Sequence, residues 1–319
     1  MRNNIKVLII TFLIIMAGLS FSGCTKNQYS ENPELLPSLK LPSHGGFIPH
    51  DFVVQLGADV SNLPHEMLVY KVGPIKIDEK GTEKLCAIFR IDINAVSNED
   101  ENTVIRKQAG NTLSIYNKTG FYEFSTQNLF NYTPDKQVPG DEECLALAKS
   151  FVNKYRLLPD LYQYKTSLSN ITYHPSFNEE IIIDKVITFH PTIDSKEVIG
   201  PKFGVIIGDK GKVEGVNSTL YTLIPIGNYT LKSIDEVVRE LKENKAVAWS
   251  TELENPDADK LIVDKVATEY YGDIGTTFEP GQQFVQPIYE LSGEIIYKND
   301  EKGKFEVYLP AVDNQFIIH

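Results

Sequence analysis

Strand-like runs separated by glycine-containing turns occupy most of the chain from residue 167 onward. They cover residues 167–174, 181–190, 203–208 and 212–224, and three further runs are KLIVDKVATEYY, QFVQPIYELSGEIIYKND and GKFEVYLPAV. The segments GDKGKV and NDEKGK place a glycine between consecutive runs, which is typical of turns that join antiparallel strands. A chain with this pattern is expected to fold around an antiparallel sheet, since each run needs a neighbouring strand for its backbone hydrogen bonds.

Three helices are predicted between the strand-like runs. The first is DEKGTEKLCAIFRI, and the second begins with Asp141 as its N-cap and ends near Leu158. In the third, SIDEVVRELKENK, Ser233 and Glu236 form a capping box. A helix followed by strands recurs over residues 78–125, 141–225 and 233–310. This order predicts an α+β protein, with helices packed on antiparallel sheets in recurring helix-then-strands units.

A β-hairpin is predicted before the second helix. The segment NTLSIYNKTGFYEFS contains two strand-like runs, Leu113–Tyr116 and Phe121–Phe124. Gly120 lies between them and supplies the positive φ angle that the turn requires.

The first 23 residues have the layout of a secretory signal peptide. Arg2 and Lys6 precede an apolar core, Val7–Leu19, which is shorter than the roughly 20 residues of a membrane-spanning helix. The segment FSGC resembles the lipobox of bacterial and archaeal lipoproteins, in which the peptide is cut before the cysteine and the sulfur is lipidated. The resemblance implies a protein anchored to the cell membrane by a lipid on Cys24, with its body outside the cytoplasm. An uncleaved N-terminal anchor is the alternative.

Composition divides the remaining chain into a stalk and two domains. Residues 24–46 are rich in proline and polar residues and predict a flexible stalk. The proline-containing stretch NYTPDKQVPGDEE then separates an N-terminal α+β domain at 47–135 from a C-terminal α+β domain at 136–319. Without residues 1–23 the chain has 29 basic and 43 acidic residues, and this net charge of −14 argues against a nucleic-acid partner.

Two kinds of covalent modification are compatible with an exported chain. Cys86 and Cys144 can form a disulfide, and two buried thiols that pack as small apolar groups are the alternative. Asn-x-Ser/Thr triplets permit N-glycosylation at Asn117, Asn131, Asn170, Asn217 and Asn228.

Motifs for catalysis or cofactor binding are absent from the sequence. It contains no G-x-S-x-G, H-E-x-x-H or G-x-x-x-x-G-K-S/T pattern, so we predict no catalytic residue, no cofactor and no metal. Weak metal-binding alternatives are His44 with His50, His174 with His190, and Asp257 with Asp259 and Asp264. The densest aromatic cluster is Tyr155, Tyr162 and Tyr164, for which a binding surface is the alternative to ordinary packing.

Two stretches resemble PepSY-like and YycH/YycI-type extracytoplasmic domains. The first, KFGVIIGDKGKVEGVNSTLYTLIPIGNYTLKSIDEVVRELKE, runs strand, turn, strand and capped helix; QPIYELSGE and GKFEVYLPAV then add an aromatic-proline strand and a hairpin. The resemblance covers about residues 140–319. It implies a non-enzymatic module that binds or regulates an envelope protein. It implies nothing about the oligomeric state. An envelope hydrolase without a recognisable motif and a structural surface protein are the alternatives.

Overall fold

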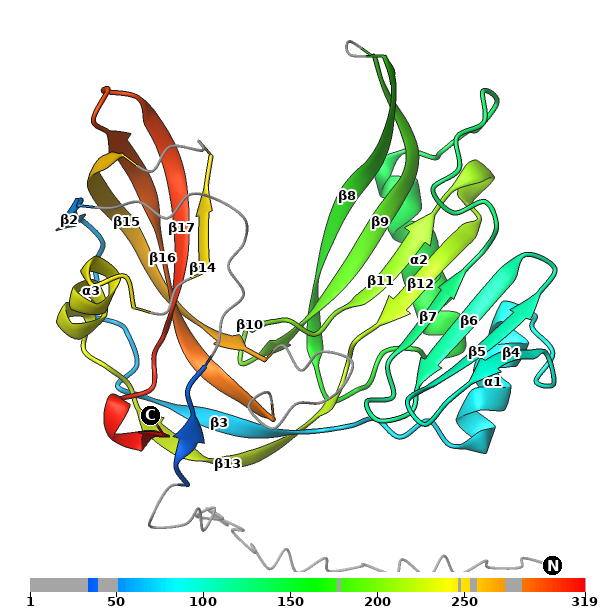
Figure 1. Cartoon of the computed structure of the whole chain (residues 1–319), viewed down its shortest axis with the longest axis horizontal. Helices are drawn as coiled ribbons and strands as arrows, with labels where there is room; N and C mark the ends of the chain where they lie inside the picture. Colours follow the sequence, from blue (N-terminus) through cyan, green and yellow to red (C-terminus); the bar gives the residue numbers. More distant parts are fainter. Residues whose placement is uncertain are drawn as a thin grey trace, which may run out of the picture.

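Two lobes stand side by side on a shared base in the computed structural model of this chain (Figure 1). The structure describes residues 34–39, 51–176, 179–245, 248–252, 257–272 and 283–318. The α3 lobe contains β2 (Val53–Leu56), α3 (Ile234–Lys242), β14 (Ala248–Thr251), β15 (Ala258–Tyr271), β16 (Phe284–Tyr297) and β17 (Lys302–Pro310). The α1–α2 lobe contains α1 (Glu79–Phe89), β4 (Val96–Glu99), β5 (Thr103–Gln108), β6 (Asn111–Tyr116), β7 (Tyr122–Ser125), α2 (Asp141–Tyr155), β8 (Gln163–Ser176), β9 (Glu179–Ile193), β11 (Phe203–Ile207) and β12 (Val213–Ser218).

The α3 lobe is built on long antiparallel strands. β15 pairs with β16 along most of its length, β17 pairs with β16, and β14 pairs with β17. Apolar residues alternate with polar ones along β16 and β17, so that Leu291 and Val307 are fully buried while their neighbours Glu290 and Glu306 lie on the other face. Helix α3 contributes Val237 to the same core cluster. The alternation therefore leaves a polar face on the sheet, opposite its core.

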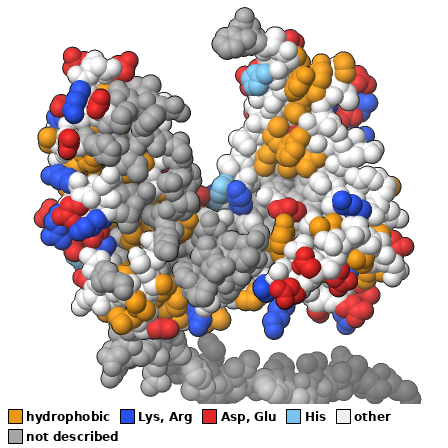
Figure 2. All heavy atoms as spheres, viewed as in Figure 1, with side chains coloured by type: hydrophobic (Ala, Val, Ile, Leu, Met, Phe, Trp, Pro, Cys, Tyr) orange, Lys and Arg blue, Asp and Glu red, His pale blue; other side chains and the backbone are white. Residues whose placement is uncertain are grey.

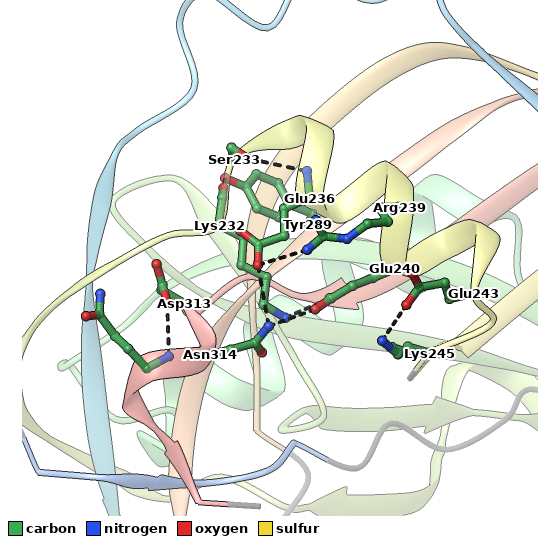
Figure 3. Close-up of polar contacts among 11 residues, drawn as sticks. Lys232, Ser233, Glu236, Arg239, Glu240, Glu243, Lys245, Tyr289, Asp313 and Asn314 are labelled. Carbon is green, nitrogen blue, oxygen red and sulfur yellow. Dashed lines mark hydrogen bonds and ion pairs between the residues drawn. The ribbon is translucent and has the colours of Figure 1, made fainter.

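A buried ion pair attaches α3 to the segment that precedes it (Figure 3). Lys232 Nζ lies 2.7 Å from Glu240 Oε2, and both side chains are almost completely buried. Asn314 Nδ2 donates to Glu240 Oε1 at 3.0 Å, and Tyr289 Oη donates to the backbone carbonyl of Lys232 at 2.9 Å. These contacts join the helix to the end of the described chain and to β16.

The α1–α2 lobe is a twisted antiparallel sheet covered by two helices. From β9 its strand order is β11, β12, β7, β6, β5 and β4, and β8 pairs with the other side of β9. Phe89 of α1 stacks on Phe124 of β7 with ring centroids 4.2 Å apart. Ala148 of α2 is fully buried in the same core cluster. Each helix thus covers one part of a common sheet face.

Three strands connect the two lobes at the base. β10 (Lys196–Ile199) pairs antiparallel with β9 and parallel with β15, so one sheet continues from lobe to lobe. β3 (Glu66–Gly73) and β13 (Thr222–Thr230) pair with each other below both lobes (Figure 1). Fully buried Tyr221 adds a link, because Tyr162 Oη donates to its carbonyl at 2.6 Å and its own hydroxyl donates to Gly272 O at 2.5 Å.

A two-stranded parallel ribbon closes the α3 side of the base. β1 (Leu36–Pro37) pairs with β18 (Ile317–Ile318). Leu36 is fully buried, and Tyr229 Oη donates to Glu34 O at 2.8 Å. Gln286 Nε2 also donates to Pro37 O at 3.0 Å, so β1 is fixed to the long strands of the base.

The α+β prediction is wrong, because the protein is mostly β. Eighteen strands and three α-helices are found in the described residues, and sixteen of the strands belong to one mixed sheet. The expected helix-then-strands units do not exist as separate layers. β7 of the unit at 78–125 pairs with β12 of the unit at 141–225. β13, which begins in that second unit, pairs with β3, which precedes the first. Short helices packed on a few strands cannot cover a sheet of this width. The division into domains at 47–135 and 136–319 stays a prediction, although the β7–β12 pairing crosses residue 135.

Local predictions were more successful than the overall one. Ser233 is the N-cap of α3, and its hydroxyl accepts from the Glu236 N–H at 3.3 Å, which is one of the two hydrogen bonds of the predicted capping box. The hairpin around Gly120 is formed by β6 and β7, and Gly120 has a φ of +73°. Two details are wrong: Gly140 is the N-cap of α2 in place of Asp141, and the strand expected at 212–224 is divided into β12 and β13. No helix among the described residues is long and apolar enough to cross a bilayer.

Candidate functional site

A pocket lined by four glutamates lies on the α3 lobe and the adjoining strand β10. It has a volume of about 260 Å³. Figure 2 shows that the two lobes stand apart above their shared base. One glutamate comes from each of four strands: Glu197 from β10, Glu269 from β15, Glu290 from β16 and Glu306 from β17. The other lining residues are Ile199, Ala248, Trp249, Ser250, Tyr271 and Tyr308. The pocket exists because the polar faces of β15–β17 continue across β10 towards the α1–α2 lobe.

Negative charge in this pocket is only partly compensated. Lys265 pairs with Glu290 at 2.7 Å, but within the described ranges neither Glu269 nor Glu306 forms an ion pair with a lysine or arginine. Burial raises the pKa of Glu269 above its ordinary value, and the charge of Glu290 adds to the shift. The hydrogen bond from the Glu197 N–H and the positive charges of Lys165 and Lys196 act in the opposite direction. A carboxylate in this environment is stabilised by any cation that enters the pocket.

Tyrosine rings form the less polar part of the pocket wall. Tyr308 donates its hydroxyl to Glu306, and burial raises the pKa of Tyr308, with the negative charge of Glu306 acting in the same direction. The hydroxyl therefore stays protonated. Aromatic rings beside carboxylates suit an organic cation, since the ring faces attract positive charge and the carboxylates accept hydrogen bonds.

Glu197 also belongs to a chain of polar contacts with β8 and β9. His190 Nδ1 lies 3.2 Å from Glu197 Oε1, and Ser167 Oγ lies 2.8 Å from His190 Nε2. The hydrogen bond from His190 is the main reason why the pKa of Glu197 is below its ordinary value. The strand register produces this row. Lys165 of β8 lies opposite His190 of β9, and Thr192 of β9 lies opposite Glu197 of β10. Ser167, His190 and Glu197 therefore lie diagonally across three neighbouring strands.

This row has the contact order of a nucleophile, a base and a carboxylate that orients the base. With Nδ1–H directed at Glu197, the Nε2 atom of His190 can accept the proton of the Ser167 hydroxyl. The same contacts also arise between polar residues on the solvent-facing side of any antiparallel sheet. Ser167 lies within a regular strand, so the contacts are explained without catalysis.

A larger hollow of about 690 Å³ borders the pocket on the same sheet face. Its lining carries charges of both signs: Lys302 lies 2.9 Å from Glu294, and the backbone N–H of Lys304 donates to Glu252 Oε2 at 3.0 Å. A ligand would have to compete with these internal pairs. The glutamate pocket is therefore the better candidate for binding a cation.

The structure does not bring the weak metal-ligand candidates together. His190 is paired with Lys165, nine residues from His174 along β8, which places the histidines about 30 Å apart. Asp259 and Asp264 lie five residues apart on β15, a separation of about 17 Å. Within the described residues, no three His, Cys, Asp or Glu side chains are arranged to hold a metal ion. His44 and His50 lie outside those residues.

Both cysteines of the body are buried free thiols in the structure. Cys86 on α1 and Cys144 on α2 belong to the same core cluster. Burial raises the pKa of each thiol, and Cys144 Sγ donates to Pro139 O at 3.4 Å. In the structure the two cysteines therefore pack as separate buried thiols. A disulfide between them stays a prediction. Cys24 lies outside the described residues.

The predicted glycosylation sites differ in exposure. Asn217 is partly buried in β12, between its neighbours β11 and β7. The other four side chains are exposed: Asn117, Asn131, Asn170 and Asn228. Glycosylation at these positions stays a prediction.

The aromatic cluster after α2 is packed. Tyr162 is buried and bonded to Tyr221, and Tyr164 Oη donates to Pro159 O at 3.1 Å. Tyr155 packs edge-on against Phe151 of the same helix, with ring centroids 5.1 Å apart. These tyrosines therefore serve ordinary packing, which was the first of the two interpretations of the cluster, and not a binding surface.

The pocket glutamates were not identified from the sequence. Glu290 lies in IYELS of β16 and Glu306 in FEVY of β17, each between two apolar or aromatic residues of a strand-like run. A glutamate at the solvent-facing position of a strand is ordinary, and only the pairing of four strands reveals the group. Comparison with protein-family models and with curated proteins gives no match to this chain.

Proposed function

We propose that the protein is a non-enzymatic binding module, tethered outside the cytoplasm by a lipid on Cys24, whose glutamate pocket takes a cationic group of an envelope partner. The observation that carries the proposal is the convergence of Glu197, Glu269, Glu290 and Glu306 on one pocket of the α3 lobe and β10. The tether rests on the lipobox-like FSGC segment, and the regulatory character rests on the PepSY-like resemblance; both stay predictions.

Electrostatics favours a cationic ligand over an anionic or neutral one. A cation near Glu269 relieves its repulsion with Glu290 and replaces part of the hydration that burial has removed. The acidic chain as a whole also attracts basic partners and raises their association rate at low ionic strength. Tyr271 and Tyr308 can pack against the apolar stem of an alkylammonium group.

The experiment measures binding of spermidine, a small organic cation, to the full chain in detergent by calorimetry. Replacing Glu269 and Glu306 together with glutamine should weaken binding at least tenfold, about 1.4 kcal/mol, because two charges are lost without a change in size. Glu294→Gln is the matched control, since Glu294 is also on a strand of this sheet face but outside the pocket. Equal weakening in both variants would assign the binding to the general acidity of the surface.

Binding should also depend on pH in a way that identifies Glu269. A protonated Glu269 is neutral and no longer attracts a cation, and its pKa is raised above the ordinary value. Spermidine affinity should therefore begin to fall, as the pH is lowered, at a higher pH than a normal glutamate would cause. In Glu269→Gln this early part of the decline should disappear. An unchanged pH profile in that variant would exclude Glu269 from the binding site.

A second candidate function, hydrolysis through Ser167, is favoured by the 2.8 Å contact between Ser167 Oγ and His190 Nε2. If Ser167 is a nucleophile, a fluorophosphonate should label it, and both Ser167→Ala and His190→Gln should abolish the label. We expect no label on the wild-type protein, because the contacts of His190 are those of a cross-strand polar row. A label on Ser167 that requires His190 would replace the binding module with the hydrolase.

A further inference from the structure

A second pocket, in the α1–α2 lobe, is lined by both helices of that lobe and by the sheet that they cover. It has a volume of about 380 Å³. Phe89 of α1, Phe124 of β7 and Phe151 of α2 form its apolar part. Lys212, just before β12, and Glu214, the second residue of β12, contribute charged groups. This pocket shares no lining residue with the glutamate pocket, so it is a separate candidate site.

The buried carboxylate of Glu214 lacks part of its hydrogen bonding. Glu214 is only 2% exposed, and its Oε2 accepts from the hydroxyl of Thr126, which also lines the pocket. Its Oε1 is buried and has no donor anywhere in the part of the chain that the structure describes. The buried lysine Lys136 pairs with Asp184 at 2.9 Å and does not bond to Glu214. A buried carboxylate oxygen without a donor is destabilising, and a ligand that donates to it would remove this cost.

Positive charge lies at the outer edge of the same pocket. Arg90 and Lys212 line it and are both exposed, whereas Glu214 is buried, so the two cations are closer to solvent than the carboxylate. Among the described residues Arg90 forms no ion pair, and Lys212 lies 3.8 Å from Asp209 in a largely exposed contact. An anionic group at the mouth of the pocket would therefore be attracted by both cations.

These charges discriminate between classes of ligand. A simple anion is repelled by Glu214 and cannot donate to its Oε1, while a simple amine is repelled by Arg90 and Lys212. A zwitterion satisfies both ends of the pocket, because it carries an ammonium group for the carboxylate and a carboxylate for the two cations. The three phenylalanine rings provide a surface for an apolar side chain on the same ligand.

We propose that this pocket binds a free α-amino acid with an apolar or aromatic side chain. Its ammonium group donates to Glu214 Oε1, its carboxylate binds Arg90 and Lys212, and its side chain lies against the phenylalanine rings. The volume is within the range of small-molecule sites, about 300–1,000 Å³. The inference is independent of the proposed function, because the glutamate pocket contributes nothing to this site.

The probe is L-phenylalanine, and calorimetry measures its binding to the full chain in detergent. Two analogues each lack one charge: hydrocinnamate has no ammonium group, and phenethylamine has no carboxylate. Each analogue should bind at least tenfold more weakly than L-phenylalanine, because one end of the pocket then stays unpaired. Absence of saturable L-phenylalanine binding up to about 10 mM, or tighter binding of either analogue, overturns the proposal.

Two variants assign the ends of the ligand. Glu214→Gln should weaken L-phenylalanine binding at least tenfold without weakening hydrocinnamate, which has no ammonium group to lose a partner. Arg90→Gln/Lys212→Gln should weaken L-phenylalanine at least tenfold without weakening phenethylamine. Because Arg90 and Lys212 are exposed, this second variant should stay folded and tests the proposal even if Glu214→Gln is unstable. Unchanged L-phenylalanine binding in the second variant overturns the zwitterion site.

The matched control is Lys149→Gln, which removes an exposed lysine of α2 that does not line the pocket. It should leave L-phenylalanine binding within about threefold of the wild type, because exposed charges at a distance are largely screened by salt. A loss in this control equal to that in Arg90→Gln/Lys212→Gln would assign the effect to overall charge and overturn the proposal.

Discussion

Replacing Glu240 with leucine should lower the free energy of unfolding by about 3–5 kcal/mol, because the substitution leaves the ammonium of Lys232 buried without its partner. The two charged groups lie 2.7 Å apart, with only 4% of the Lys232 side chain and 9% of the Glu240 side chain exposed. The Asn314 side chain would also lose its acceptor on Glu240. Urea unfolding of the full chain in detergent, followed by circular dichroism, measures the change.

Two controls identify the unpaired charge as the cause. The double variant Lys232→Met/Glu240→Leu removes both charges and should recover most of the loss, because apolar side chains of similar size can replace a buried pair. Glu236→Gln removes the carboxylate from the more exposed pair with Arg239, 3.5 Å away in the same helix, and should change stability by less than about 1 kcal/mol. A double variant as unstable as Glu240→Leu would show that packing, and not charge, causes the loss.

Replacing Tyr221 with alanine should destabilise the protein by about 3–5 kcal/mol, the usual cost of removing a buried aromatic side chain. Tyr221 is fully buried, and its hydroxyl donates to Gly272 O at the end of β15. The ring therefore fills the junction of the lobes, and its loss leaves a cavity there. Because Gly272 directly follows Tyr271, which lines the glutamate pocket, spermidine binding should weaken in the same variant.

The conservative variant Tyr221→Phe separates the ring from the hydroxyl. It keeps the ring and removes the hydroxyl that donates to Gly272, so it should cost about 1–3 kcal/mol, the usual cost of leaving a buried carbonyl without its donor. Urea unfolding and calorimetry with spermidine check both variants. Stability of Tyr221→Ala within 1 kcal/mol of the wild type would show that the junction closes around the missing ring and that Tyr221 does not hold the lobes together.

Features that depend on neighbouring residues were predictable from the sequence, and long-range pairing was not. The N-cap at Ser233 and the turn at Gly120 involve contacts over a few residues, and both are present. The run at 212–224 reads as one strand, but Leu220 and Tyr221 are buried at a point where the chain passes from β12 to β13. Its two halves pair with β7 and β3, which are distant in sequence. Periodicity carries no information about these partners.

The same limit explains why the candidate site was missed. Glu197 and Glu306 are separated by more than a hundred residues, and each alone is an ordinary solvent-facing residue of a strand. They become neighbours only through the series of pairings from β10 to β15, β16 and β17. Ser167 and His190 are likewise joined by the β8–β9 register. Histidines and aspartates that are close in sequence, such as Asp259 and Asp264, were easier to notice and are not brought together.

The parallel ribbon of β1 and β18 affects the order in which the protein can assemble during synthesis. Leu36 pairs with Ile317, so one of the first described residues to leave the ribosome must wait for one of the last. Until then the pocket around buried Leu36 is unfilled, and β3, β13 and β16 lack a neighbour that completes the base. Closing so long a loop is slow. Completion of the base therefore has to follow the synthesis of β3, β13 and β16, and a nascent chain halted before Ile317 would expose this apolar seam to chaperones and proteases.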